Sequence, residues 1–344
     1  MQNYPNTQAE MEQMFENEEA CRKRIAEQRW QGGFVCGACG GTLGWEMGNG
    51  RILCRSCRHQ QSVLAGTIFQ DTHLPLKTWF RAMWLVCASK NGMSAQNLQR
   101  LLGLRSYNTA WLCLHKLRRA MVRPGRERLS GMVEADETYI GGPAEGKRGR
   151  GAFGKRIVVV IAERRGEAIG RIRLAEVPNV RAESLKPVVL DYVEPGSTVV
   201  TDGWTGYNFL HSEGYERIKE VKDESELASV VLPRCHLVVS LVKRWILGTL
   251  QGSIGADHLQ DYLNEFTFRF NRRASRSRGL LFQRLLELTV QTAPNTRNSI
   301  IPPTFSGWLS QLHTQLLVMC LALFLSIMAK HFFPRFSSVA FGGR

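Results

Sequence analysis

Four cysteines in two closely spaced pairs constrain the fold of this chain more than any other feature. Cys36 and Cys39 form the first pair, Cys54 and Cys57 form the second, and a glycine-rich stretch separates them. Two such pairs can present four thiolates tetrahedrally to one metal ion, and glycines permit the tight turns that this requires. The spacing predicts a zinc ribbon with a structural Zn²⁺, because protein ligands fill all four positions. A pair of redox dithiols is the alternative, but it lacks the usual strand-to-helix context.

Charge is distributed unevenly along the chain. Of its 344 residues, 44% are hydrophobic and 22% are charged, so a folded chain of several domains is expected and a wholly disordered one is excluded. The net charge is +15, and residues 20–130 hold eighteen Lys or Arg against four acids. This segregation indicates a polyanionic partner for the first third of the chain. The acidic N-terminus lacks the features of a signal peptide, which favours the cytoplasm, where disulfides are rare.

A basic segment after the cysteines has the pattern of a helix-turn-helix. Ser94 can cap a helix that stops at Gly103, and a second helix runs from Tyr107 to Met121. In a helix-turn-helix the second helix enters the major groove of DNA. We therefore expect the start of this helix to face the bases and its basic residues to face phosphates, and the predicted contacts are Arg105, Ser106, Tyr107, Asn108, Lys116, Arg118 and Arg119. A helical hairpin with a basic outer face is the alternative.

From residue 131 the pattern changes to strands, and two of them carry an aspartate. In the strand from Met132 to Ile140, Asp136 shares a face with Glu134, and a later strand ends at Asp202. Three strands, a helix and a fourth strand form the order of an RNase H-like core, in which such acids hold two divalent ions. A buried acid paired with arginine and an ordinary Asp-Gly turn is the alternative, but the strand order favours the metal site.

Several motifs, in the same order, resemble those of one family. The segments MVEADETYIGG, VTDGWTGY, LVKRWILGT and HLQDYLNEFTFRFNRR are similar to signatures of the DDE-type insertion-sequence transposases with an N-terminal zinc ribbon. The resemblance extends from about Trp30 to about Leu288. It implies a protein that binds double-stranded DNA at element ends and in the target, forms a homo-oligomer there, and cleaves and joins strands with Mg²⁺ or Mn²⁺.

The resemblance also implies catalytic residues. Asp136 and Asp202 match the first two catalytic acids and are the expected ligands of Mg²⁺ or Mn²⁺. The family places a basic residue seven positions after its third acid; Lys243 fits that residue, which puts His236 in the third position. A neutral imidazole can bind a metal, but replacing a carboxylate weakens the hold on a hard cation. A polar residue at the start of a helix is the alternative for His236.

A second carboxylate is available farther along the chain. Glu265, Arg269 and Arg272 are spaced to share one helical face and match a Glu-Arg-Arg signature found in part of the family. Glu265 either supplies the missing carboxylate or pairs with Arg269 in a supporting role, which we favour. The two arginines are then expected near DNA phosphate.

Two further segments remain. Gly141 to Lys155 is rich in glycine and basic residues and is interpreted as a loop that reaches the DNA backbone through Lys147, Arg148 and Arg150, although such loops are often only solvated. Near the C-terminus, the uncharged stretch Leu309 to Met328 has too many polar residues at one end for a membrane span, so a buried or partner helix is expected. Read-through into a tail unrelated to the family is a third interpretation.

The sequence thus predicts an α+β multidomain protein with a zinc ribbon, a helix-turn-helix-like segment and an RNase H-like mixed α/β core. The expected divisions are an acidic N-terminal segment (1–29), the zinc ribbon (30–65), the basic helical segment (66–128), the catalytic domain (129–290) and a divergent tail (291–344). The predicted function is a transposase. The alternative is a catalytically inactive, element-derived DNA-binding protein or repressor, since the third catalytic position is not acidic.

Overall fold

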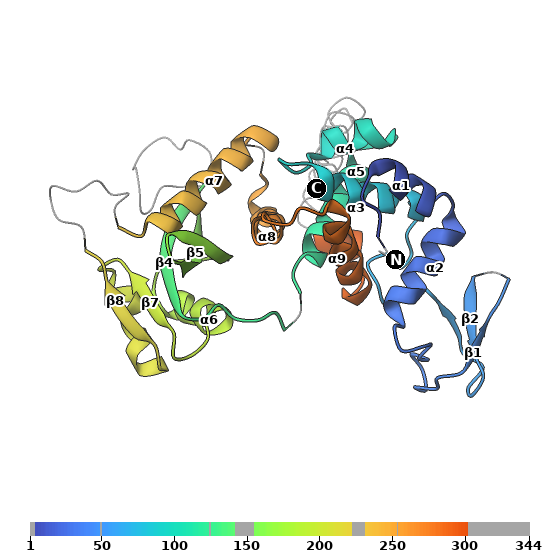
Figure 1. Cartoon of the computed structure of the whole chain (residues 1–344), viewed down its shortest axis with the longest axis horizontal. Coiled ribbons are helices and arrows are strands. Elements are labelled where there is room, and N and C mark those ends of the chain that lie inside the picture. The colour runs from blue at the N-terminus through green and yellow to red at the C-terminus, as the bar shows by residue number, and fades with distance from the viewer. Residues whose placement is uncertain are drawn as a thin grey trace, which may run out of the picture. The chain divides into compact units, whose positions relative to one another are not determined.

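A five-stranded mixed sheet is the largest element of the computed structural model, which describes residues 4–48, 50–123, 125–141, 155–221, 231–252 and 254–301 (Figure 1). Its strands are β4 (Met132–Ile140), β5 (Arg156–Arg165), β6 (Ala168–Val177), β7 (Thr198–Thr201) and β8 (Glu216–Lys219). Their order is β6-β5-β4-β7-β8, with antiparallel pairing from β6 to β4 and parallel pairing from β4 to β8. This is an RNase H-like core, as predicted.

Helices cover both faces of this sheet. Side chains on one face of β4 and β5 pack with α7 (Pro233–Thr249) and α8 (Leu259–Phe270), which follows the 3₁₀ turn η3 (Ala256–His258). The opposite face packs with α6 (Ala182–Tyr192) and the 3₁₀ helix η1 (Thr205–Glu213). The alternation of β4 separates the two cores, because Val133 and Ala135 lie in the second and Ile140 in the first.

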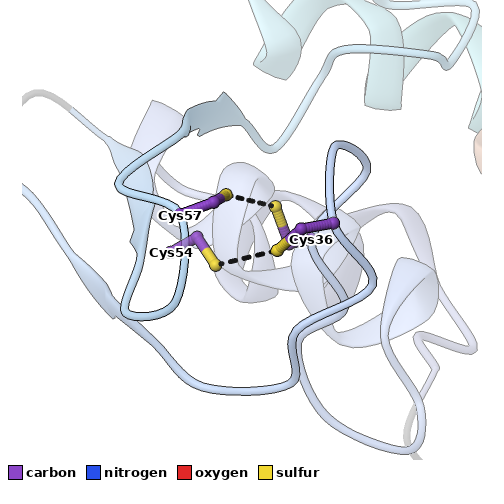
Figure 2. A group of neighbouring side chains, drawn as sticks. Cys36, Cys54 and Cys57 are labelled. Atoms are coloured by element: carbon purple, nitrogen blue, oxygen red, sulfur yellow. Dashed lines mark hydrogen bonds between the residues drawn. The ribbon is translucent and has the colours of Figure 1, made fainter.

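The four cysteines lie together in a small antiparallel sheet. Strands β1 (Gly44–Glu46), β2 (Arg51–Cys54) and β3 (Gln60–Ser62) form it in chain order. The sulfurs of Cys36 and Cys57 lie 3.7 Å apart, as do those of Cys39 and Cys54 (Figure 2). Four sulfurs placed tetrahedrally about 2.3 Å from a zinc ion lie about 3.8 Å from one another. The geometry therefore fits a structural zinc, as the spacing predicted.

Backbone N–H groups in this site favour the thiolate form of a cysteine. Those of Cys57 and Ser56 point at the Cys54 sulfur and, although burial opposes them, they lower the pKa of that thiol. Zinc binds thiolate, so this shift assists metal binding.

The predicted helix-turn-helix is present. Helix α3 (Leu76–Ala88) precedes α4 (Ala95–Leu102) and α5 (Tyr107–Ala120). The Ser94 hydroxyl accepts a hydrogen bond from the N–H of Asn97 at 3.2 Å, and α4 ends at Gly103 with φ of 62°. The Ser106 hydroxyl caps α5 in the same way, accepting from the N–H of Asn108.

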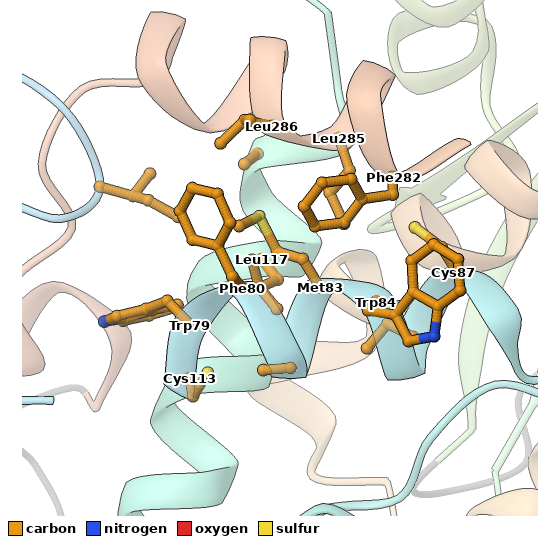
Figure 3. Close-up of a cluster of buried hydrophobic side chains, with 14 of the residues drawn as sticks. Trp79, Phe80, Met83, Trp84, Cys87, Cys113, Leu117, Phe282, Leu285 and Leu286 are labelled. Atoms are coloured by element: carbon orange, nitrogen blue, oxygen red, sulfur yellow. The ribbon is translucent and has the colours of Figure 1, made fainter. Parts of the chain in front are cut away.

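Helix α9 (Arg278–Gln291) completes the core of this helical region. Phe282, Leu285 and Leu286 of α9 lie in one hydrophobic cluster with α3 and α5 (Figure 3). The Phe282 ring contacts the rings of Phe80 and Trp84, with centroids 5.8 and 6.0 Å away. The sequence placed residues 278–290 with the catalytic segment, whereas their side chains pack in the helical core because both faces of the sheet are already covered.

The acidic N-terminal segment is folded onto the same core as two helices, α1 (Gln8–Met14) and α2 (Glu18–Arg29). The Glu18 carboxylate accepts hydrogen bonds from the backbone N–H groups of Leu76 and Lys77, both at 2.9 Å. It thereby caps α3, whose N-terminus attracts negative charge. Glu12 pairs with Arg81 at 2.6 Å. These acids thus hold the first two helices against α3.

The chain divides into two units, Met1–Pro294 and Asn295–Arg344. In the second unit, the structure describes α10 (Arg297–Ile300), which is capped by the Thr296 hydroxyl. The predicted apolar helix at Leu309 to Met328 lies outside the described residues. Within the described ranges, no helix is long and apolar enough to cross a membrane.

Substituting one ribbon cysteine should abolish zinc binding. We expect Cys54→Ser to lose the zinc bound by the purified wild-type chain and to make the ribbon sensitive to protease, because a structural zinc site contributes directly to folding. Ser56→Ala, in the same turn, is the control and should retain its zinc. Atomic absorption and limited proteolysis measure both outcomes, and a Cys54→Ser chain with full zinc content would contradict the assignment.

Candidate active site

Strand pairing places the two predicted catalytic aspartates side by side. Strands β4 and β7 run parallel, with Glu134 opposite Val200. Two residues farther along, Asp136 on β4 corresponds to Asp202, which directly follows β7. Carboxyl ends of adjacent parallel strands meet at one edge of a sheet, where ligands commonly bind. The fold therefore brings together two acids that are 66 positions apart in the sequence.

His236 approaches the same place from α7. Burial raises the pKa of the half-buried Asp136 carboxyl, His236 and the Glu137 backbone N–H oppose this shift, and the charges of Asp202 and Glu134 reinforce it. His236, Asp202 and Glu134 therefore lie close enough to Asp136 to affect the ionisation of its carboxyl. A bound cation would lower the pKa of Asp136, in opposition to the effect of burial, and would favour the ionised carboxylate.

The turn that carries Asp202 is held from several sides. Its Oδ1 accepts a hydrogen bond from the backbone N–H of Trp204 at 2.9 Å. Arg217 donates to the carbonyl oxygens of Asp202 and Trp204, and to the Thr201 hydroxyl. The Trp204 indole N–H donates to the carbonyl of Val180 at 2.7 Å. One Asp202 carboxylate oxygen thus fixes the turn, while the other is available to a ligand.

A second carboxylate on β4 anchors α7. Glu134 is fully buried and accepts hydrogen bonds from the backbone N–H groups of Arg234 and Cys235 at 2.8 and 3.0 Å. It also pairs with the guanidinium groups of Arg164 and Arg234 at 3.0 and 3.1 Å. Glu134 therefore satisfies the first turn of α7, one residue before His236.

The sequence indicated the position of Glu134 but not its role. Alternation placed it on the same face as Asp136, and the pairing of a buried strand acid with arginine was considered for Asp136 instead. The structure assigns that pairing to Glu134. Arg164 and Arg234 belong to other elements, so their convergence on one carboxylate requires the folded chain.

The donor set suits a divalent cation. Two carboxylates and an imidazole are acceptable ligands for Mg²⁺ or Mn²⁺, and in the described part of the chain neither Asp136 nor Asp202 is engaged in an ion pair with Lys or Arg. Among the described residues, the three donors do not converge within 4.8 Å as the cysteine sulfurs do. Water molecules in the coordination shell, which Mg²⁺ usually keeps, would bridge this difference.

Lys243 and Glu265 lie in different surroundings. Lys243 is exposed on α7, two turns after His236. Glu265 is fully buried on α8 and pairs with Arg118 of α5 at 2.8 Å, while the Arg269 guanidinium lies 3.8 Å away. This placement favours the supporting role for Glu265.

Arg118 does not face DNA in this structure, which corrects the expectation from the sequence. Arg118 is 1% exposed, and its guanidinium stacks on the Tyr262 ring, 4.2 Å from the centroid. The physical reason is the buried Glu265 carboxylate, which requires a cation beside it. Arg118 therefore joins α5 to α8.

A buried imidazole lies beside this pair. His115 Nδ1 donates to Asp261 at 2.8 Å, and burial lowers the His115 pKa to about 4 although Asp261 opposes the shift. With His258, these side chains could geometrically hold a metal. Guanidinium groups of Arg118, 3.4 Å from His115 Nε2, and Arg119, 3.3 Å from Asp261, disfavour a cation there. We interpret the cluster as a structural contact with neutral His115.

The remaining predicted DNA contacts differ in exposure where the structure describes them. Arg105, Ser106, Tyr107 and Asn108 are exposed at the start of α5, in agreement with a groove-facing position. Lys116 and Arg119 are half-buried, and burial lowers the pKa of Lys116. Lys147, Arg148 and Arg150 lie outside the described residues.

The two arginines of the Glu-Arg-Arg signature make different contacts. Arg269 is held inside by Glu265 and by the carbonyl oxygens of Ser89 and Lys90, so it is not free to meet a phosphate. Arg272 follows the end of α8 and stacks on Phe268, 4.1 Å from the ring centroid. The shared helical face predicted from the spacing is therefore interrupted, because α8 ends at Phe270.

Comparison with known families assigns the two main parts of the chain. Residues 16–60 match the transposase zinc-ribbon domain, and residues 128–271 match the ISXO2-like transposase domain of the DDE type. The chain thus carries a transposase zinc-ribbon domain followed by an ISXO2-like transposase domain. Both matches agree with the resemblance inferred from the motifs.

One relative and two solved structures are similar to part of the chain. The transposase is 25% identical over 277 residues to an uncharacterized protein in transposable element ISH50 of Halobacterium salinarum, covering 74% of this chain and 91% of that protein. A pre-cleavage Mos1 transpososome is 11% identical with a TM-score of 0.25, over 63% of this chain and 80% of that one. A Mos1 strand transfer complex is 14% identical with a TM-score of 0.22, over 56% and 75% of the chains. TM-scores this low establish no residue-by-residue correspondence between the structures.

Removing the Glu134 charge should destabilise the transposase. We expect Glu134→Gln to lower the free energy of unfolding by about 3 kcal/mol, because it leaves two arginines without their buried partner. Glu220→Gln is a matched control, since Glu220 pairs with the same Arg164 but its side chain is 34% exposed. That variant should lose less than about 1 kcal/mol. Urea denaturation measures both, and equal losses would show that Glu134 has no special anchoring role.

Proposed function

We propose that this transposase binds the ends of an insertion sequence as double-stranded DNA and catalyses metal-dependent DNA cleavage and strand transfer. The parallel pairing of β4 and β7, which sets Asp136 beside Asp202, is the observation that supports this proposal most strongly. His236 adds an imidazole to the two carboxylates. Asp136 and Asp202 would hold Mg²⁺ or Mn²⁺, which lowers the barrier to in-line attack on a phosphodiester.

The protein groups have separate roles in this proposal. Asp136 and Asp202 supply negative oxygen ligands, and His236 supplies a neutral third ligand. Glu134 fixes α7 so that His236 stays beside Asp136. Water would first free the 3′-hydroxyl at an element end, and that hydroxyl would then attack a target phosphodiester and displace the next 3′-oxygen. Lys243, exposed on the same helix, would contact the DNA backbone.

DNA binding would involve the exposed start of α5. Tyr107 is 49% exposed there, and Arg105, two residues earlier, is also exposed. The second helix of a helix-turn-helix reads base edges with such residues. As in the sequence-based expectation, we propose that the transposase forms a homo-oligomer on DNA, since two element ends must be joined to one target.

A catalytically inactive DNA-binding protein is the second candidate. The specific observation that favours it is His236, because a neutral ligand in place of a carboxylate weakens binding of a hard cation.

Strand transfer separates the two candidates. We expect the wild-type chain to join a labelled element end to target DNA in Mn²⁺, and Asp136→Asn to reduce joining by at least about a hundredfold because one metal ligand loses its charge. Both proteins should bind the same end in a mobility-shift assay without added metal. Binding without any joining by the wild type would reject the catalytic function and leave the DNA-binding protein.

The third ligand can be identified in the same assay. We expect His236→Ala to abolish joining and His236→Glu to retain it, because the glutamate restores a carboxylate. Glu265→Gln should lower the melting temperature, through loss of its pairing with Arg118, more than it lowers joining per folded molecule. His211→Ala, which removes an exposed imidazole, is the control. If Glu265→Gln alone abolishes joining in a folded protein, the assignment to His236 is wrong.

A further inference from the structure

Five arginines line one small pocket at the edge of the sheet formed by β6. The pocket has a volume of about 300 Å³ and lies between the segment after α5, strand β6 and the end of α8. Its arginines are Arg123, Arg126, Arg171, Arg173 and Arg272, and its one acidic lining residue is Glu127. The site already described does not use this pocket.

The arginines that β6 contributes to the pocket lie on the opposite face of the sheet from Asp136. Asp136 pairs with Val160, which in turn pairs with Leu174, so these three share one face. Arg173 pairs with Ile161, which pairs with Ala135, and these occupy the other face. A ligand in the pocket would therefore bind apart from Asp136 and Asp202.

Arg173 is the most informative of the five. It is 5% exposed, and its Nη1 and Nη2 donate to the carbonyl oxygens of Ile172 and Glu127. Its buried Nε has no hydrogen-bond partner among the residues that the structure describes. Burial, reinforced by the charges of Arg126 and Arg171, lowers the Arg173 pKa to about 10. A buried guanidinium with a free N–H and neighbouring positive charges calls for an anion.

The nearby acids do not neutralise this charge. Arg171 is paired with Glu163 at 2.6 Å and with Glu127 at 3.0 Å, so both acids are already engaged. In the part of the chain that the structure describes, the other four arginines form no ion pair. Arg126 stacks on Tyr192 and Arg272 on Phe268, at 4.7 and 4.1 Å from the ring centroids. These contacts orient the guanidinium planes without removing their charge.

We propose that this pocket binds a phosphate group of the DNA backbone, away from the catalytic centre. Planar guanidinium groups bind phosphate through paired N–H donors. A bound phosphate would also offset the repulsion between several guanidinium groups held close together. The pocket borders Met121, at the end of α5 opposite Tyr107. The bound phosphate is thus remote from the bases that α5 would read, so the contact adds affinity equally for all sequences. The choice of DNA as the source rests on the proposed function.

Two variants and a matched control test the pocket with the full chain. Arg123→Gln/Arg126→Gln and, separately, Arg272→Gln remove charge from different walls. Arg128→Gln/Arg276→Gln removes two exposed arginines that do not line the pocket. Binding of a short labelled duplex is measured by fluorescence anisotropy over a range of salt concentrations. We expect the slope of log Kd against log salt to fall by about one for each pocket variant and to stay unchanged for the control.

A second arm uses inorganic phosphate without DNA. At constant ionic strength, phosphate in place of chloride should raise the melting temperature of the wild type and of the control, but not of the pocket variants. If phosphate protects the wild type through these arginines while the DNA slopes are equal, the site takes free phosphate and the DNA source is wrong. If neither arm distinguishes pocket variants from the control, the pocket binds no phosphate. A wild type that binds no duplex would reject the proposed function, whereas the phosphate arm would still decide the pocket.

Discussion

The buried carboxylate of Glu134 is the constraint on which the arrangement of the catalytic face depends. Removing a carboxylate from water costs several kcal/mol unless charges and hydrogen bonds replace the lost hydration. Here two guanidinium groups and two backbone N–H groups do so, and three of these four partners belong to Arg234 and Cys235 at the start of α7. These contacts hold the start of α7 at this position on β4. Since Asp136 lies two residues along the same strand face, the energetics of one buried acid fix the surroundings of the other.

Buried arginines change what the strong positive charge means. The sequence gives a net charge of +15, which indicates a polyanionic partner, but Arg24, Arg118 and Arg173 are each at most 5% exposed. Arg118 neutralises a buried acid, whereas within the described ranges Arg173 has neither an acid partner nor full hydrogen bonding. A count of bases cannot separate these cases. Only the local balance of charge and hydration shows which arginines hold the fold together and which are available to a ligand.

Local patterns predicted the elements well, and distant partners explain where the predictions failed. Caps at Ser94 and Gly103, the alternation around Asp136 and the strand order are encoded within short stretches, so the helix-turn-helix and the RNase H-like core could be predicted. The fate of Arg118 could not, because Glu265 lies 147 residues away in the chain. The packing of α9 was missed for a similar reason, since an amphipathic pattern does not say which of two cores a helix will join.

Helix α9 also imposes an order on how the chain can mature at the ribosome. The core of α3 and α5 lacks Phe282, Leu285 and Leu286 until the end of the RNase H-like region has been translated. Before α9 has been synthesised, the helical region exposes apolar surface, which promotes aggregation. The predicted DNA-reading helix therefore gains its full support only after the catalytic region exists. The proposed DNA binding through α5 would therefore begin only after the RNase H-like region is complete, and a nascent fragment that ends before α9 would lack part of the core that supports α5.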